Sequence, residues 1–237
     1  MMRTETVRDA GPALPAPEAV CRCVEEMRAV CRDAWRQGLL SGCNGNASSR
    51  LRDGAAGGVL CMTRTGAAKG RLTAADICLL DAATGECLAN GPASSEAAVH
   101  LALYAARPAC AAVLHTHPRR LLALSLVQRD PGEGTAAFLR LPLFEADVWR
   151  ARLAVAPALA PGTRELADAV AEAAATLPAD AGKGGAVWME GHGLCCFAPS
   201  LSAALTMSEE LEHLAAVQLL ALGAGAGPTP EPVPLPI

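Results

Sequence analysis

The stretch Ala-Ala-Val-Leu-His-Thr-His, residues 111–117, contributes most to the fold that we expect for this chain. Four apolar residues that lead into His-Thr-His are typical of a buried strand that reaches its polar end. Side chains alternate along a strand, so His115 and His117 should point to the same face, with Cα atoms about 6.5–7 Å apart. Both imidazoles can then reach one shared ion.

A third histidine lies in Glu-Gly-His-Gly, residues 190–193. Gly191 and Gly193 let the backbone around His192 bend sharply and approach a neighbour closely. The chain has only five histidines, and we predict that His115, His117 and His192 bind one metal ion. The residues alone do not distinguish zinc from manganese, cobalt or iron at three histidines. In the alternative interpretation, the histidines are ordinary polar residues at a strand end.

Composition limits the possible functions. Apolar residues make up 51% of the 237 residues, and the net charge is −4. A slightly acidic chain without a basic run is not expected to bind nucleic acid or an anionic membrane surface. No apolar run reaches about 18 residues, and no signal-peptide pattern follows the first charges. The ten cysteines show no Cys-x-x-Cys spacing, so we predict a reduced, cytoplasmic protein.

The chain is expected to form one domain over residues 18–222, with a flexible N-terminus (1–17) and a disordered Pro/Gly-rich tail (223–237). Hydrophobic periodicity predicts helices over 18–37, 94–106, 118–128, 163–176 and 200–222. Strands are predicted over 46–52, 59–63, 77–81, 111–117, 139–144, 186–189 and 194–197, and residues 148–162 are expected to be irregular.

Three details of the predicted helices can be checked. Ser94 or Ser95 should cap the second helix, with Glu96 in its first turn, and Thr163 should cap the fourth. In the last helix, Leu220 should face the core and Glu212 should face solvent or a neighbour. His100 and Tyr104 share one helical face and are interpreted as packing residues.

Two loops rich in small and polar residues could bracket one phosphate. They cover residues 41–50 and 63–70, and each adjoins a predicted strand. Small residues expose backbone N–H groups, which can hold an anion. Neither loop has the Gly-Lys-Ser/Thr order of a Walker A motif. A plain turn is the alternative interpretation for residues 41–50.

Taken in order, these motifs resemble the class II aldolase/adducin family, which includes L-fuculose-1-phosphate aldolase, over residues 20–221. Residues 45–50, Gly-Asn-Ala-Ser-Ser-Arg, resemble the family's Gly-Asn-x-Ser-x-Arg phosphate loop, and residues 63–66, Thr-Arg-Thr-Gly, resemble its Thr-Pro-Ser-Gly loop. Residues 94–96, Ser-Ser-Glu, followed by His100 and Tyr104, are similar to its Ser-Ser-Glu helix start. His115-Thr116-His117 and His192-Gly193 are similar to its zinc ligands.

The resemblance implies a three-layer αβα sandwich around a central, largely antiparallel sheet. It also implies a homotetramer with active sites at subunit interfaces, and zinc held by the three histidines. Glu96 would be the catalytic acid/base beside the metal. The substrate phosphate would be bound by five residues: Asn46, Thr65, Gly66, Ser94 and Ser95.

The reaction implied by the resemblance is aldol cleavage. A zinc-dependent aldolase would cleave a small ketose 1-phosphate, of the fuculose-phosphate type or a 5-deoxy or 5-methylthio pentulose 1-phosphate, to dihydroxyacetone phosphate and an aldehyde. Two departures stand out. Arg64 replaces a proline of the family's loop, and the tyrosine expected as second proton donor is missing, because Tyr104 is the only tyrosine. Glu145 could take that role, or it could be a solvated acid at a strand end.

Three alternatives remain open. The metal site would also serve a methylthioribulose-1-phosphate dehydratase, which would employ a carboxylate. A ribulose-phosphate 4-epimerase ranks lower, for want of a second tyrosine. A non-enzymatic, adducin-like assembly domain belongs to another class, and its relatives are expected to lack the three histidines that this chain retains.

Overall fold

The structure is a computed structural model that describes residues 15–51, 58–127, 139–141, 143–178 and 184–225. A mixed, mostly antiparallel sheet of eight strands runs through it, in the order β4-β3-β2-β1-β5-β8-β7-β6. The strands are β1 (Asn46–Leu51), β2 (Val59–Thr63), β3 (Ile77–Asp81), β4 (Cys87–Ala89), β5 (Ala112–Thr116), β6 (Leu153–Ala156), β7 (Gly185–Met189) and β8 (Gly193–Ala198). All neighbours are antiparallel except β6 and β7, which are parallel.

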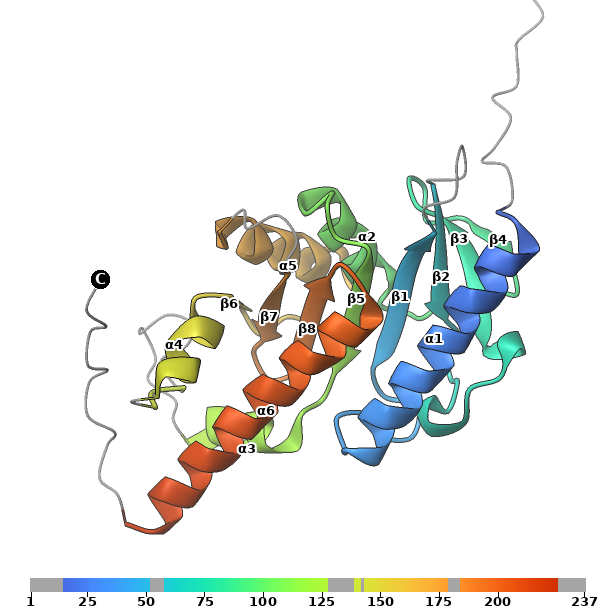
Figure 1. Cartoon of the computed structure of the whole chain (residues 1–237). Helices are drawn as coiled ribbons and strands as arrows, with labels where there is room; N and C mark the ends of the chain where they lie inside the picture. Colours follow the sequence, from blue (N-terminus) through green and yellow to red (C-terminus); the bar gives the residue numbers. More distant parts are fainter. Residues whose placement is uncertain (1–14, 52–57, 128–138, 142, 179–183, 226–237) are drawn as a thin grey trace, which may run out of the picture.

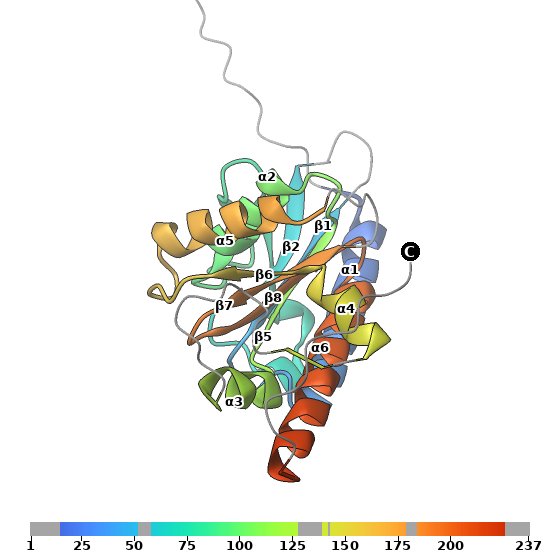
Figure 2. The same ribbon diagram turned by 90° about the vertical axis from the view of Figure 1, so that its left-hand side faces the viewer.

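Helices cover both faces of this sheet, which confirms the predicted three layers (Figures 1 and 2). One face carries α1 (Pro17–Arg36), α3 (Arg119–Val127) and α6 (Leu201–Gly223), and α4 (Phe144–Arg150) packs against α6. The other face carries α2 (Ala97–Ala106) and α5 (Arg164–Thr176), which pack against each other.

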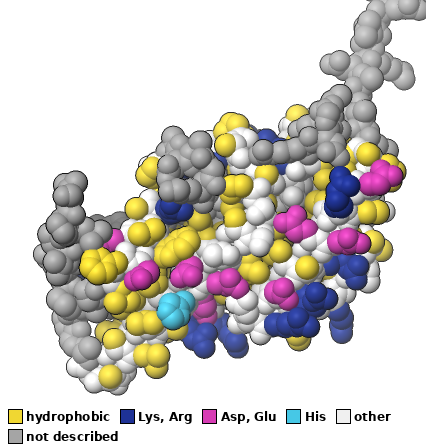
Figure 3. Space-filling model, viewed as in Figure 1, with side chains coloured by type: hydrophobic (Ala, Val, Ile, Leu, Met, Phe, Trp, Pro, Cys, Tyr) yellow, Lys and Arg dark blue, Asp and Glu magenta, His cyan; other side chains and the backbone are white. Residues whose placement is uncertain are grey.

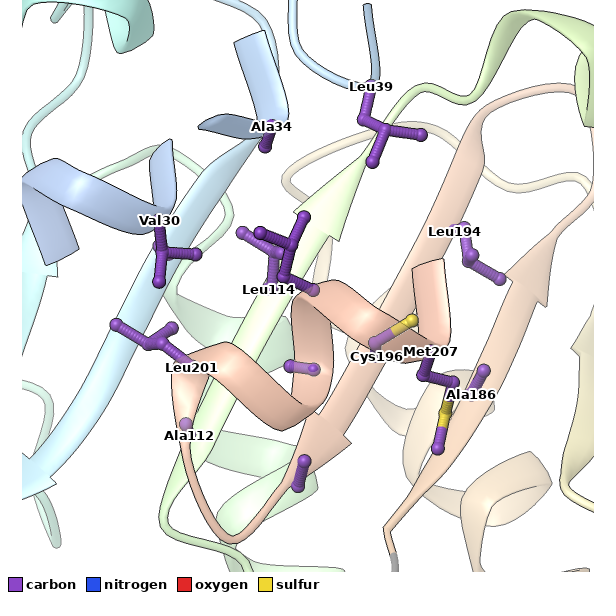
Figure 4. Packing of buried hydrophobic residues seen from close by; sticks show 14 of the residues in the cluster. Val30, Ala34, Leu39, Ala112, Leu114, Ala186, Leu194, Cys196, Leu201 and Met207 are labelled. Carbon is purple, nitrogen blue, oxygen red and sulfur yellow. The ribbon is translucent and has the colours of Figure 1, made fainter. Parts of the chain in front are cut away.

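Alternation along the central strands divides the core into two apolar clusters. Ala112 and Leu114 of β5 belong to the cluster under α1 and α6, whereas Val113 belongs to the cluster under α2 and α5. Figure 4 shows Leu114 and Cys196 of the sheet facing Val30 of α1 and Met207 of α6. Because His115 follows this alternation, its side chain lies on the α2 face of the sheet.

The predicted strand over residues 139–144 is wrong. Leu139 and Leu141 lie in irregular chain and bury their side chains without strand partners, and Phe144 begins α4. The prediction that residues 148–162 are irregular is also wrong in part, since Leu153–Ala156 form β6. The backbone partner of β6 is β7, about thirty residues later, so local sequence could not reveal it.

Helix details bring three further corrections. Glu96 itself is the N-cap of α2, and neither Ser94 nor Ser95 caps this helix with its side chain. Leu220 is 74% exposed, because the end of α6 extends past the sheet (Figure 1). Glu212 is only 7% exposed. Thr163 does cap α5, accepting the N–H of Leu166.

Over α1 and α6, acidic and basic side chains lie intermixed with apolar ones (Figure 3). All ten cysteines are free: Cys21, Cys43 and Cys87 are exposed, and the other seven are buried. In the described part of the chain, no helix has the length and apolar character needed to cross a membrane.

Candidate active site

The three predicted histidines meet at one end of the central strands. His115 lies near the end of β5, His117 directly follows that strand, and His192 lies in the turn between β7 and β8. Gly191 adopts a φ of +68° in this turn, a conformation that glycine adopts without strain. Ring centroids are 4.7 Å apart for His115 and His117, 4.8 Å for His115 and His192, and 5.4 Å for His117 and His192.

This arrangement fits a divalent cation. One nitrogen of each ring lies within 4.8 Å of the other two. His115 Nδ1 donates to the carbonyl of Leu194 at 3.1 Å, so its Nε2 lone pair points into the cluster, as in many metal-binding histidines. Nε2 of His117 lies 3.0 Å from that atom, and two imidazole nitrogens at this distance need a proton or a cation between them.

Burial favours the neutral, metal-binding form of His115 and His117. The pKa of His115 is lowered by burial to about 3, against an opposing effect of Glu96. Burial also lowers the pKa of His117. A neutral ring carries the lone pair that a cation requires, so no proton has to be displaced at neutral pH.

Glu96 contacts two of the histidines. Its Oε1 lies 3.1 Å from Nε2 of His192, and its Oε2 lies 3.3 Å from Nε2 of His115. Burial raises the pKa of this carboxyl, but the hydrogen bond from His192, electrostatic interactions with His115 and His192, and the hydrogen bond from Asn46 outweigh burial and lower the pKa to about 2. Glu96 is therefore an ionised carboxylate beside the histidine cluster, and its role as catalytic acid/base stays a prediction.

A chain of buried polar side chains extends behind Glu96. Asn46 Nδ2 donates to Glu96 Oε2 at 2.7 Å, and Asn46 Oδ1 lies 2.5 Å from His100 Nε2. His100 Nδ1 contacts Ser48 Oγ at 2.6 Å, and Ser48 Oγ contacts Tyr104 Oη at 2.9 Å. His100 and Tyr104 are buried, as expected of packing residues, but their hydrogen bonds were not foreseen; their shared helical face was the available signal.

The two candidate phosphate loops lie beside the start of α2. Arg64 forms a β-bridge with Ala93, Thr65 N–H donates to the carbonyl of Pro92, and Ser94 N–H donates to the carbonyl of Thr63. These contacts bring Thr65 and Gly66 next to Ser94 and Ser95. Thr65, Gly66 and Ser95 are exposed, and Ser94 is half-buried. Their phosphate-binding role stays a prediction.

The side chains of Asn46 and Lys69 are both buried. Asn46 is 3% exposed, and its amide contacts Glu96 and His100, so its phosphate role also stays a prediction. Lys69 is 1% exposed, and its Nζ donates to the carbonyls of Cys43 (3.0 Å) and Ala67 (2.7 Å). Its buried ammonium group thus ties the two loops together, and burial lowers its pKa.

The two departures from the family pattern can now be placed. The guanidinium of Arg64 donates to the carbonyl of Ala75 at 3.1 Å. Glu145 is exposed in the first turn of α4, which packs against α6. Its catalytic role stays a prediction.

Comparison with protein families gives one match across most of the chain. The model of the class II aldolase and adducin N-terminal domain matches residues 25–219. Among curated proteins, 3-oxo-tetronate 4-phosphate decarboxylase of Haemophilus influenzae is 31% identical, over 78% of this chain and 80% of the relative. L-Fuculose phosphate aldolase of Escherichia coli is 30% identical, over 81% of this chain and 80% of the relative.

Solved structures give the same picture. YgbL from Klebsiella pneumoniae superposes with a TM-score of 0.71 at 29% identity, covering 85% of this chain and 90% of that one. L-Fuculose-1-phosphate aldolase from Thermus thermophilus superposes with a TM-score of 0.70 at 28% identity, covering 89% of this chain and 100% of that one. The residues matched by the family model, 25–219, include all eight strands and the positions of the three histidines.

Proposed function

This chain belongs to the class II aldolase and adducin family, and we propose that it is a metal-dependent lyase that cleaves a carbon–carbon bond of a sugar phosphate. The observation that carries the proposal is the contact of Glu96 with the histidine cluster, 3.1 Å from His192 and 3.3 Å from His115. A non-enzymatic assembly domain would not need three convergent imidazoles beside a buried carboxylate, so the adducin-like alternative is disfavoured.

We propose zinc as the ion, held by His115, His117 and His192. When bound, a divalent cation would act as a Lewis acid on the substrate carbonyl and stabilise the negative charge left by the departing fragment. The electron pair of the broken bond must then receive a proton at carbon, and Glu96 is the group in place to deliver it. A substrate that separates Glu96 from the histidines would leave burial as the dominant effect, which raises the pKa of the carboxyl and favours its protonated form.

Two carbon–carbon cleavage reactions are possible here: aldol cleavage, which releases an aldehyde, and decarboxylation, which releases CO2. Aldol cleavage first removes a proton from a hydroxyl group, and so it needs a second proton carrier beside Glu96. Loss of CO2 from a 3-oxo acid needs no such step: the carboxylate leaves as CO2, and one proton is added to the carbon it left. For 3-oxo-tetronate 4-phosphate the product is dihydroxyacetone phosphate, which is also the product of aldol cleavage of a ketose 1-phosphate.

The tyrosine content favours the decarboxylation. The only tyrosine, Tyr104, is 2% exposed and bonded to Ser48, so within the chain it cannot protonate or deprotonate an entering aldehyde. We therefore rank a 3-oxo sugar-acid phosphate first, in agreement with the 31% identical decarboxylase. Aldol cleavage of a ketose 1-phosphate is the second candidate, supported by the 30% identical aldolase, with Glu145 as the second proton carrier.

The substrate phosphate, we propose, lies against Thr65, Gly66, Ser94 and Ser95, with the amide of Asn46 nearby. Backbone N–H groups in such loops hold an anion, and the buried ammonium group of Lys69 adds positive charge behind them. The φ of +71° at Gly66 and the open space beside it allow a ligand to approach the backbone closely.

We also propose a homotetramer with active sites at subunit interfaces, located in the cytoplasm. Exposed apolar side chains on α4, Phe144 (72%) and Val148 (51%), would be covered by another subunit. Ten free cysteines favour a reducing compartment. Sedimentation of the active protein tests the assembly, and a monomer at assay concentrations would rule out shared sites.

The deciding experiment measures dihydroxyacetone phosphate and CO2 from 3-oxo-tetronate 4-phosphate and from a panel of ketose 1-phosphates, with zinc and with chelator. Zinc-dependent release from the oxo acid alone supports the decarboxylase, and release from a ketose supports the aldolase. Glu96→Gln should abolish either, whereas Glu172→Gln, an exposed carboxylate on α5, should not. No metal-dependent release from any substrate would overturn the lyase proposal.

A further inference from the structure

We propose that His100 is a positioning residue, which fixes one oxygen of Glu96 through Asn46 and leaves the other for proton transfer. The inference rests on the proposed lyase function and adds a residue that does not touch the substrate. It comes from the polar side chains behind Glu96, which form one unbranched path through Asn46, His100 and Ser48 to Tyr104.

The direction of every hydrogen bond in this path follows from the carboxylate at its end. A carboxylate only accepts, so Asn46 must turn its NH2 group toward Glu96 Oε2 (2.7 Å) and its carbonyl oxygen toward His100. His100 Nε2 must then carry a proton and donate to Asn46 Oδ1 (2.5 Å). Since a neutral imidazole has one N–H, His100 Nδ1 accepts from the hydroxyl of Ser48 (2.6 Å). The oxygen of Ser48 is left to accept from Tyr104 (2.9 Å).

The buried position of these side chains disfavours the reverse arrangement of protons. Ser48 and His100 are 0% exposed, and Tyr104 is 2% exposed, so water cannot replace a partner. A flipped amide at Asn46 would aim its oxygen at the carboxylate, which loses the hydrogen bond to Glu96 in a buried region even if His100 changed tautomer to accept from the NH2 group. Burial also lowers the pKa of His100 to about 4, in agreement with the neutral ring that the path requires.

The consequence for Glu96 is a difference between its two oxygens. Oε2 is held by Asn46, which β1 places directly opposite His115 of β5. Oε1 faces His192 at 3.1 Å and has no other hydrogen-bond donor among the described residues. A carboxylate fixed at one oxygen keeps a single orientation, and a proton carrier displaced by about 1 Å can lose about a hundredfold in rate. Oε1 is thus the oxygen that carries the proton.

The variants His100→Leu and His100→Gln test this role. Leucine cannot donate to Asn46, whereas a glutamine amide can donate to Asn46 and accept from Ser48. We expect His100→Leu to lower kcat at least tenfold with KM and zinc content within twofold of the wild type, and His100→Gln to recover most of kcat. Thr163→Ala, which removes the α5 cap on the same side of the sheet, is the control for lost stability and should keep kcat.

A second measurement does not depend on activity. Nitrogen-15 NMR of the zinc-loaded protein, labelled at its five histidines, should show His100 as the neutral Nε2–H form at neutral pH. An Nδ1–H form would overturn the direction of the path, whether or not the protein is a lyase. If the protein is a lyase and His100→Leu retains the kcat of the wild type, the positioning role is wrong while the proposed function stands.

Discussion

Glu212 of α6 should hold the start of α3, and with it the segment that follows the metal ligand His117. Its carboxylate accepts the backbone N–H of Arg120 at 3.0 Å and that of Leu121 at 3.0 Å. The first N–H groups of a helix have no partner within the helix. A carboxylate from a distant helix, Glu212, therefore does here what an N-cap side chain usually does.

The cost of removing this cap can be worked out from the contacts. Glu212→Gln keeps one oxygen acceptor but loses the charge, so the free energy of unfolding should fall by about 1 kcal/mol. Glu212→Ala leaves both N–H groups without this partner, and that of Leu121 belongs to a fully buried residue. The expected loss is about 3 kcal/mol.

Urea-induced unfolding at pH 7 is the assay. Chelator removes the contribution of metal binding, and several protein concentrations separate any contribution of subunit association. The matched control is Glu210→Gln on the same helix, which should change the free energy by less than about 0.5 kcal/mol. The reasoning fails if Glu212→Ala costs less than about 1 kcal/mol, or if the Glu210 variant loses as much.

Three further predictions concern the surroundings of the site. Burial lowers the pKa of His100 to about 4, below the value of about 6.5 in an unfolded chain. The unfolded state therefore binds more protons, and the free energy of unfolding falls as pH drops from about 6.5 to 4. Thermal unfolding across this range should show a melting temperature that depends less on pH in His100→Gln than in the wild type. Lys69→Met leaves two loop carbonyls without a donor, and it should lower the free energy of unfolding by about 1–3 kcal/mol and raise KM more than it lowers kcat in the lyase assay. Gly193→Ala would place a Cβ 2.6 Å from the carbonyl oxygen of Thr116 and 3.1 Å from His115 Cε1, so zinc content by atomic absorption should drop; Gly223→Ala, with nothing within 4 Å, should leave it unchanged.

Sequence reasoning worked best where local pattern and tertiary environment agree. The alternation that ends in His115 predicted a buried strand and a shared face for His117, and Thr163 marked the start of α5. In each case the determining contacts lie within a few residues. The glycine-flanked His192 was predicted as the third histidine, and the structure places it beside the other two.

The features that were missed depend on distant partners. Strand β6 exists because β7 pairs with it, and the burial of Glu212 depends on N–H groups at the start of α3. The link from Glu96 to His100 runs through Asn46, about fifty residues earlier in the chain. Polar side chains that satisfy one another across such separations leave no periodic signal, so sequence alone suggested packing for His100.

Because the thiols differ in exposure, the number of cysteines that react with an alkylating reagent should distinguish folded from unfolded chains. Three of its ten cysteines are exposed and seven are buried, and burial raises the pKa of Cys31 to about 12 and that of Cys78 to about 11. Because only thiolate reacts with an alkylating reagent, a short pulse should add at most three labels to a folded chain and ten to an unfolded one. Intact-protein mass spectrometry would then count the two populations directly, in crude mixtures and without any added dye.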